Sequence, residues 1–177
     1  VIGFSVMGAK EAPSEYLEYQ TKTELSLPFR GEWYVFWGGR ALSQNQHALA
    51  KDQRFAYDFV VMKGGSSHAG KGEKNEEYFC FGQPILAPGS GTVVAVQDGV
   101  EDNMPGVMNA GQPLGNYAII DHGNGEFSFL AHLRRGSVRV KKGDKVKAGD
   151  RLGDCGNSGH SSEPHLHYHL QNTAEPF

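Results

Sequence analysis

The chain has 177 residues and a formal net charge of −3 at pH 7, a size that suits one domain with a substantial core, and its charge gives no sign of a nucleic-acid partner. No apolar run approaches the ~20 residues that a membrane-spanning helix needs. The 24 glycines are about twice the usual share, which predicts many turns between short strands.

The first 37 residues predict an N-terminal extension that packs on the core, before a domain over residues 38–177. The extension is mixed and polar, with one helix candidate at residues 11–20. Residues 32–37 are aromatic and strand-like and end at two glycines, and we expect the aromatic side chains, including Tyr34 and Phe36, to belong to the core.

The remaining chain predicts short strands between glycine-rich turns. In residues 55–62, Phe55, Tyr57 and Phe59 point one way and Asp58 points the other. Residues 63–77 and 98–113 are polar loops, and further strands or apolar stretches are expected at residues 78–81, 84–87, 91–97, 117–121, 127–133, 138–140, 145–146 and 151–153. We therefore expect an all-β, mainly antiparallel fold, a central sheet or open sandwich with long loops and a minor helix near the N-terminus.

Residues 164–170 read Pro-His-Leu-His-Tyr-His-Leu and are the most informative segment of the chain. If they form a strand, side chains alternate and His165, His167 and His169 share one face. Neutral imidazole is among the commonest zinc ligands, so this pattern predicts a metal site. A solvated histidine-rich strand near the chain end is the alternative.

Asp58 interrupts an apolar run, where an unpaired carboxylate is costly. A bound metal would account for it, and an ion pair with Arg40 or Arg54 is the plainer alternative. His47 lies upstream in a polar segment that is free to fold over Asp58. His132 ends its own apolar stretch, which is where a site residue would sit.

Six ordered segments carry a family resemblance that covers roughly residues 38–172. They are residues 84–93 (PILAPGSGTV), 115–123 (GNYAIIDHG), 130–133 (LAHL), 140–150 (VKKGDKVKAGD), 156–159 (GNSG) and 164–167 (PHLH). In this order and spacing they resemble the lysostaphin-type zinc endopeptidases, which cut peptidoglycan peptides.

The resemblance implies a role for four residues. His167, the second histidine of His-x-His, would bind zinc, and Asp58 would be the ligand carboxylate. His165, the first histidine, would be catalytic beside the metal, with His132 as its partner.

One position departs from the family pattern. The family usually has a histidine four residues before the aspartate, and here that residue is Arg54. His47, eleven residues before Asp58, matches a longer-spaced variant and is our candidate for the remaining ligand. His68, ten residues after Asp58, is the competitor, and if neither binds, the site is degenerate.

These assignments lead us to expect a zinc-dependent endopeptidase that hydrolyses peptide bonds of bacterial peptidoglycan. Zn²⁺ on His47, Asp58 and His167 would polarise a water or the scissile carbonyl, and His132 and His165 would transfer protons and stabilise the oxyanion. The chain lacks the His-Glu-x-x-His motif of helical zinc proteases.

Two alternatives remain open. The first is an inactive relative that binds or activates another cell-wall enzyme. The second is a biotinyl- or lipoyl-type carrier, although no convincing lysine-bearing hairpin tip is present.

The substrate implies an extracytoplasmic location. The absence of a signal peptide decides nothing, because the chain opens at Val1 rather than Met. Disulfides persist in such a compartment, so we expect Cys80 and Cys155 to lie close enough to form one, with two buried thiols as the alternative. The oligomeric state is not evident from the sequence.

Overall fold

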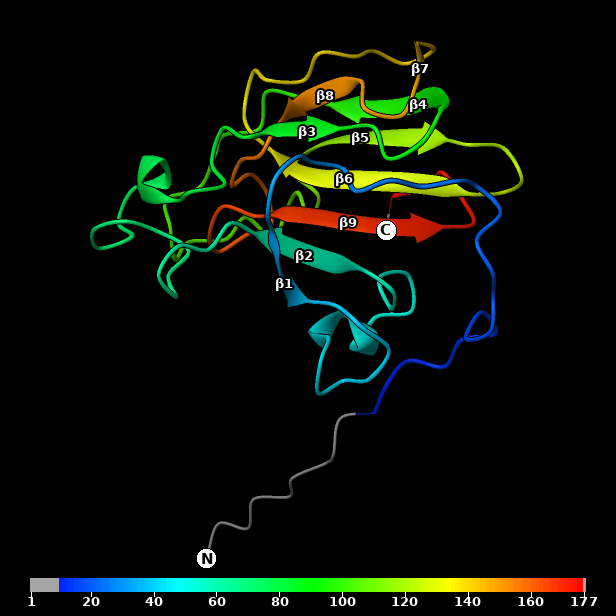
Figure 1. Ribbon diagram of the computed structural model, residues 1–177, viewed down its shortest axis with the longest axis horizontal. Helices are drawn as coiled ribbons and strands as arrows, with labels where there is room; N and C mark the ends of the chain where they lie inside the picture. The colour runs from blue at the N-terminus through cyan, green and yellow to red at the C-terminus, as the bar shows by residue number, and fades with distance from the viewer. Residues whose placement is uncertain (1–9, 177) are drawn as a thin grey trace, which may run out of the picture.

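The computed structural model describes residues 10–176, and its main element is a seven-stranded antiparallel sheet (Figure 1). Across this sheet the strands are β1 (Tyr34–Trp37), β2 (Tyr57–Val60), β9 (Leu166–Gln171), β6 (Phe127–Leu133), β5 (Asn116–Asp121), β4 (Gly91–Gln97) and β7 (Lys145–Val146). A two-stranded sheet pairs β3 (Pro84–Leu86) with β8 (Arg151–Asp154), and the two 3₁₀ helices are η1 (Gln46–Leu49) and η2 (Asn75–Glu77). The expected all-β, mainly antiparallel fold is confirmed.

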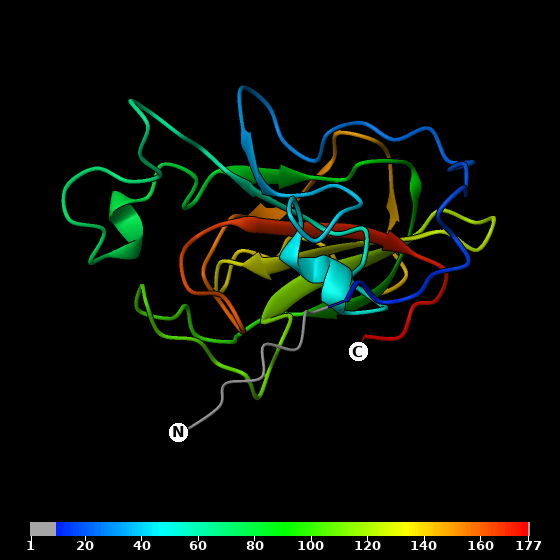
Figure 2. The ribbon, with the colours of Figure 1, turned by 90° about the horizontal axis from the view of Figure 1, so that it is seen from below.

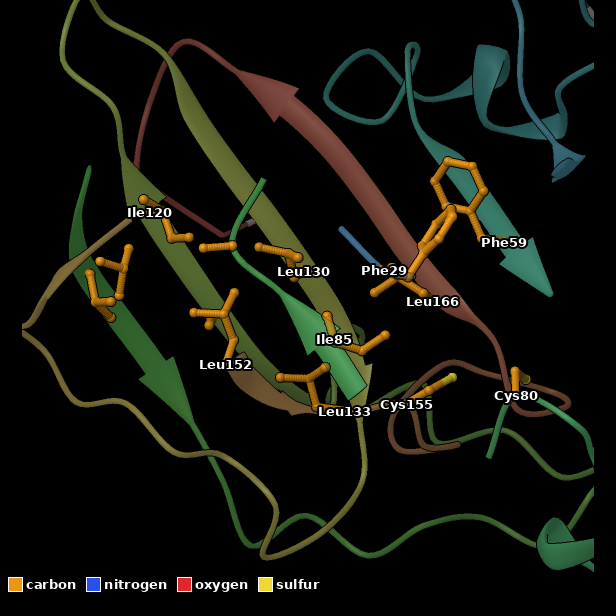
Figure 3. Close-up of a cluster of buried hydrophobic side chains, with 14 residues drawn as sticks. Phe29, Phe59, Cys80, Ile85, Ile120, Leu130, Leu133, Leu152, Cys155 and Leu166 are labelled. Atoms are coloured by element: carbon orange, nitrogen blue, oxygen red, sulfur yellow. The ribbon is translucent and has the colours of Figure 1, made fainter. Parts of the chain in front are cut away.

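The core fills the space between the two sheets (Figure 3). Ile85 of β3 and Leu152 of β8 are fully buried in one cluster with Leu130 and Leu166 of the large sheet. Because side chains alternate along a strand, His167 and His169 of β9 lie on the opposite face from Leu166. The large sheet therefore has a core face and a histidine face. Figure 2 shows η1 on the side of β9 that faces away from β3.

The helix expected at residues 11–20 is not formed, and only residues 15–18 make a turn. The segment is drawn out by contacts with distant parts of the chain: the Ala12 amide donates to the Ala48 carbonyl, and the Lys22 and Thr23 amides donate to Glu126. These tertiary hydrogen bonds hold the chain at the two ends of the expected helix.

The boundary expected between residues 37 and 38 stays a prediction, and residues 1–9 of the expected extension lie outside the described range. Within residues 10–37, β1 is an edge strand of the large sheet. Its Tyr34 and Phe36 side chains are 56% and 52% exposed, so their expected place in the core is wrong. An edge strand contacts the sheet on one side only, which leaves these rings facing solvent. Residues 138–140 also form no strand.

Cys80 and Cys155 are buried free thiols, so the alternative of two buried thiols is the one that the structure shows, and the two residues are near neighbours. The Cys80 thiol has a hydrogen-bond partner, because its Sγ donates to the Pro164 carbonyl at 3.0 Å. Burial raises the pKa of the Cys155 thiol well above its ordinary value, which disfavours the reactive thiolate.

Across residues 10–176, none of the helices is both long enough and apolar enough to span a membrane.

Candidate metal centre

Asp58 and His167 face each other because their strands pair. They are direct partners in the antiparallel β2–β9 register, and both side chains emerge on the histidine face. Asp58 Oδ1 lies 3.0 Å from His167 Nδ1, and the two residues are 6% and 3% exposed. The sheet thus fixes a buried carboxylate against an imidazole.

His47 reaches the same carboxylate from η1. Its Nε2 lies 3.4 Å from Asp58 Oδ2, and its ring centroid is 5.0 Å from that of His167. The ligand atoms of His47, Asp58 and His167 all lie within 4.8 Å of one another. His68, the competing candidate, is not part of this group and instead packs against Tyr78, with ring centroids 5.1 Å apart.

Asn45 caps η1 and sets the orientation of the His47 ring. Asn45 Oδ1 accepts from the backbone N–H of His47 at 3.1 Å and lies 2.9 Å from its Nδ1. Asn45 Nδ2 donates to the carbonyls of Gly39, Arg54 and Ala56, which can only accept, so the amide orientation is fixed. His47 Nδ1 therefore carries the proton, and the Nε2 lone pair faces Asp58.

Arg54, four residues before Asp58, holds the loop that carries His47 in place through hydrogen bonds. It is 5% exposed, and its Nη1 donates to the carbonyls of Ala12 and Ala48. Its Nη2 lies 3.6 Å from Glu11, while Arg40 pairs with Glu18. Among the described residues, the ion-pair partners of Asp58 are three histidines, so the arginine alternative is wrong.

His165 and His132 form a wall beside this group, with ring centroids 4.7 Å apart. His165 Nε2 lies 3.6 Å from Asp58 Oδ1, and its Nδ1 donates to the Glu163 carbonyl at 2.8 Å. His132 Nδ1 donates to the Ser158 carbonyl at 2.8 Å. Both rings therefore carry a proton on Nδ1, so that a neutral ring has its lone pair on Nε2.

His132 also has an unusual backbone. Its φ of 61° lies in the left-handed region, which is costly for a residue with a Cβ. The His132 N–H donates to the Leu114 carbonyl, and the ring bonds Ser158, so the surrounding structure holds the strained conformation.

Burial and charge set the protonation states that metal binding requires. Burial lowers the pKa of His47 to about 4 and that of His132 well below its ordinary value, so both imidazoles are neutral at pH 7. Burial acts to raise the pKa of Asp58, but the charge interactions around it leave this pKa well below the ordinary range, so Asp58 is a carboxylate at pH 7. Two imidazole nitrogens and one carboxylate oxygen are a ligand set that suits zinc.

Two contacts of this centre have weak or no sequence signals. The sequence did not lead us to Asn45. Its only sequence signal is its position two residues before the candidate ligand His47, directly before a 3₁₀ turn. Ser161, whose Oγ lies 3.2 Å from His165 Nδ1, was also missed and has no signal beyond its polar loop.

The profile of Peptidase family M23 matches residues 78–177. That range contains His132, His165 and His167 but neither His47 nor Asp58. The peptidoglycan DD-endopeptidase ShyA of Vibrio cholerae is 41% identical over 91 residues, which is 51% of this chain and 18% of ShyA. Endolysin 2638A of a Staphylococcus phage is 30% identical over 135 residues, which is 73% of this chain and 27% of the endolysin. The chain spans about a fifth to a quarter of the length of these curated relatives.

Solved structures agree on the fold. The catalytic domain of the prophage-encoded M23 protein EnpA from Enterococcus faecalis superposes with a TM-score of 0.52 at 24% identity, covering 84% of this chain and 88% of that one. The SpoIIIAH and SpoIIQ complex gives a TM-score of 0.55 at 18% identity, covering 84% and 92%. A zinc containing peptidase from Vibrio cholerae gives 0.50 at 19% identity, covering 85% and 37%.

Proposed function

The chain belongs to peptidase family M23, whose profile matches more than half of it, and on that premise we propose that it is a zinc-dependent endopeptidase acting on bacterial peptidoglycan. One observation carries the proposal: His47, Asp58 and His167 converge within 4.8 Å, with two further histidines beside them. The similarity to a peptidoglycan DD-endopeptidase supports the choice of substrate, and the substrate implies an extracytoplasmic location.

We propose that His47 Nε2, Asp58 and His167 Nδ1 hold the zinc ion. The fit is supported by the buried carboxylate, which has histidines rather than arginines around it, and by the lone pair that His47 directs at it. When bound, Zn²⁺ would polarise a water or the scissile carbonyl.

His165 is the proposed general base. Its Nε2 lone pair can accept a proton from the attacking water, and the Asp58 carboxylate 3.6 Å away favours the cation that results. The Glu163 carbonyl keeps the other proton on Nδ1 and holds the ring in place. The same Nε2 can then return the proton to the leaving amine, so no net charge is left behind.

His132 is proposed to orient the attacking water. Its deep burial keeps the ring neutral, and its Nδ1–H is committed to the Ser158 carbonyl. The neutral ring can therefore only accept a hydrogen bond at Nε2, which directs the water's second proton away from the scissile bond. Once His165 carries the proton taken from the water, its Nε2–H can donate to the developing oxyanion before the proton passes to the leaving amine.

The test measures zinc content and cleavage of purified peptidoglycan on the same protein. We expect about one zinc per chain, cleavage that chelator abolishes and zinc restores, and loss of both in Asp58→Asn. His122→Leu is the matched control, because His122 bonds Ser90 and Ser128 away from the centre. A chain that binds zinc but cleaves no peptidoglycan would contradict the proposal and favour the non-catalytic alternative.

A further inference from the structure

A chain of hydrogen bonds runs along β9 behind the candidate ligand His167. His167 Nε2 lies 3.0 Å from His169 Nδ1, and His169 Nε2 lies 3.0 Å from Gln171 Oε1. The three side chains share one face of the strand, because they are spaced two residues apart. Gln171 Nε2 in turn donates to the carbonyls of Thr173 and Glu175, at 2.9 and 3.0 Å.

The Gln171 end of this hydrogen-bond chain determines which ring nitrogens of His169 and His167 carry a proton. Backbone carbonyls can only accept, so the Gln171 amide nitrogen must face Thr173 and Glu175, and its oxygen must face His169. That oxygen also only accepts, so His169 carries a proton on Nε2. His169 is 1% exposed and stacks on Phe129, an environment that favours the neutral ring, whose Nδ1 then accepts.

The same argument gives the proton position at the His167 end of the hydrogen-bond chain. His169 Nδ1 accepts, so His167 must donate from Nε2. A neutral His167 then has a bare Nδ1, which faces Asp58 Oδ1 at 3.0 Å. Two acceptors at this distance repel each other unless a cation lies between them. Without His169, His167 would place its proton on Nδ1 and donate it to Asp58 Oδ1, which would occupy the Nδ1 lone pair that a metal needs.

We propose that His169 and Gln171 are positioning residues that hold His167 in the Nε2–H tautomer and so keep its Nδ1 available to a metal ion. The inference rests on the proposed zinc site and adds to it two residues that bind no metal themselves. Asn45 plays the equivalent part for His47, where a side-chain amide again fixes the tautomer.

The experiment reads the tautomer directly. The ¹⁵N spectrum of the histidine-labelled, metal-stripped chain at pH 8 reports which nitrogen of His167 carries the proton. Zinc affinity is measured separately, by competition with a chelator of known strength. The variants are His169→Leu, which removes the acceptor, and His169→Asn, whose side-chain oxygen can replace Nδ1. His122→Leu is the control for removing a hydrogen-bonded histidine outside the centre.

We expect His167 of the unaltered chain to carry its proton on Nε2. In His169→Leu the proton should move to Nδ1 in a substantial fraction of molecules, and zinc should bind roughly 10–100-fold more weakly. His169→Asn should recover most of that affinity, and His122→Leu should match the unaltered chain. A merely structural role for His169 would lower stability in both His169 variants without moving the proton.

Two results would overturn the inference: an Nδ1–H tautomer of His167 in the unaltered chain, or unchanged zinc affinity in a folded His169→Leu. If His169→Leu does not fold, Gln171→Leu replaces it, because it removes the acceptor that orients His169 from a position outside the core. The spectrum needs no zinc, so a chain that binds no metal overturns the proposed function while the tautomer is still decided.

Discussion

The ring of His132 and the carbonyl of Ser158 are joined by a 2.8 Å hydrogen bond, although the two residues lie 26 positions apart in the chain. Ser158 is itself fixed, because its Oγ donates to the Leu133 carbonyl and accepts from the backbone N–H of Asn116. The orientation of His132 therefore depends on where the loop after β8 meets β5 and β6.

Gly115→Ala is expected to disturb this contact. Gly115 has a φ of +60°, and a Cβ there would lie 2.4 Å from the Ser158 backbone. The clash should cost about 2–4 kcal/mol of stability and shift the His132 partner, lowering activity at unchanged zinc content. Denaturant unfolding and peptidoglycan cleavage measure the two effects. Gly143→Ala, with a φ of +95° but no atom within 4 Å, should cost only about 1 kcal/mol and leave activity intact.

His132→Ala and His165→Ala should abolish most cleavage while zinc stays bound. The expected loss is on the order of 10²–10⁴-fold in rate, since His165→Ala removes proton transfer and oxyanion stabilisation and His132→Ala removes the group that orients the water. His167→Ala should instead empty the site. Zinc content and cleavage are measured together for the three proteins. An empty site in His165→Ala, or normal cleavage by His132→Ala, would show that the roles are wrongly assigned.

Asn45→Ala should weaken both the fold and the centre. It leaves three buried carbonyls without their donor and frees the His47 ring, so we expect a loss of about 1–3 kcal/mol in stability and roughly tenfold weaker zinc binding. Chelator competition and urea unfolding check these values. The exposed neighbour Gln46→Ala serves as the control and should change neither.

The contact between Glu126 and the N-terminal segment is expected to weaken in acid. Burial acts to raise its pKa, but hydrogen bonds from Lys22, Thr23 and Tyr19 lower it from 4.5 to about 2. The unfolded chain therefore takes up this proton first as the pH falls, so the stabilisation is complete above about pH 4.5 and is lost towards pH 2.

Glu126→Gln should accordingly destabilise the protein by on the order of 1–3 kcal/mol at pH 7 and flatten the decline in stability below pH 4.5. The midpoints of urea unfolding, measured between pH 2 and pH 7, check both the loss of stability and its dependence on pH. Glu24→Gln, at an exposed position of the same segment, should keep the full acid dependence. If Glu126→Gln has the same dependence of stability on pH as the unaltered chain, Glu126 is excluded as the source of the stability lost in acid.

The histidine face could be predicted from the sequence because strand periodicity depends only on the backbone. The alternation in residues 164–170 predicts both the strand and the shared face of His167 and His169, and β9 is found at Leu166–Gln171. The same periodicity separates Asp58 from the core-facing Phe59 on β2.

Neither spacing nor periodicity could decide between His47 and His68. That choice depends on the path of a loop, which Asn45 and Arg54 fix through hydrogen bonds to distant carbonyls. The helix expected at residues 11–20 does not form for a related reason. Distant partners hold the chain at its two ends: Ala48 binds the Ala12 amide, and Glu126, more than 100 residues away, binds the Lys22 and Thr23 amides. Local propensity contains no information about such a partner.

The direct pairing of Asp58 with His167 determines which changes in chain length the centre can tolerate. One residue inserted within β2 would turn Asp58 towards the core face and separate it from His167. An insertion between η1 and β2 would only lengthen the path by which His47 arrives. Two candidate ligands are therefore tied to the strand register, whereas the separation of the third along the chain is not constrained by that register.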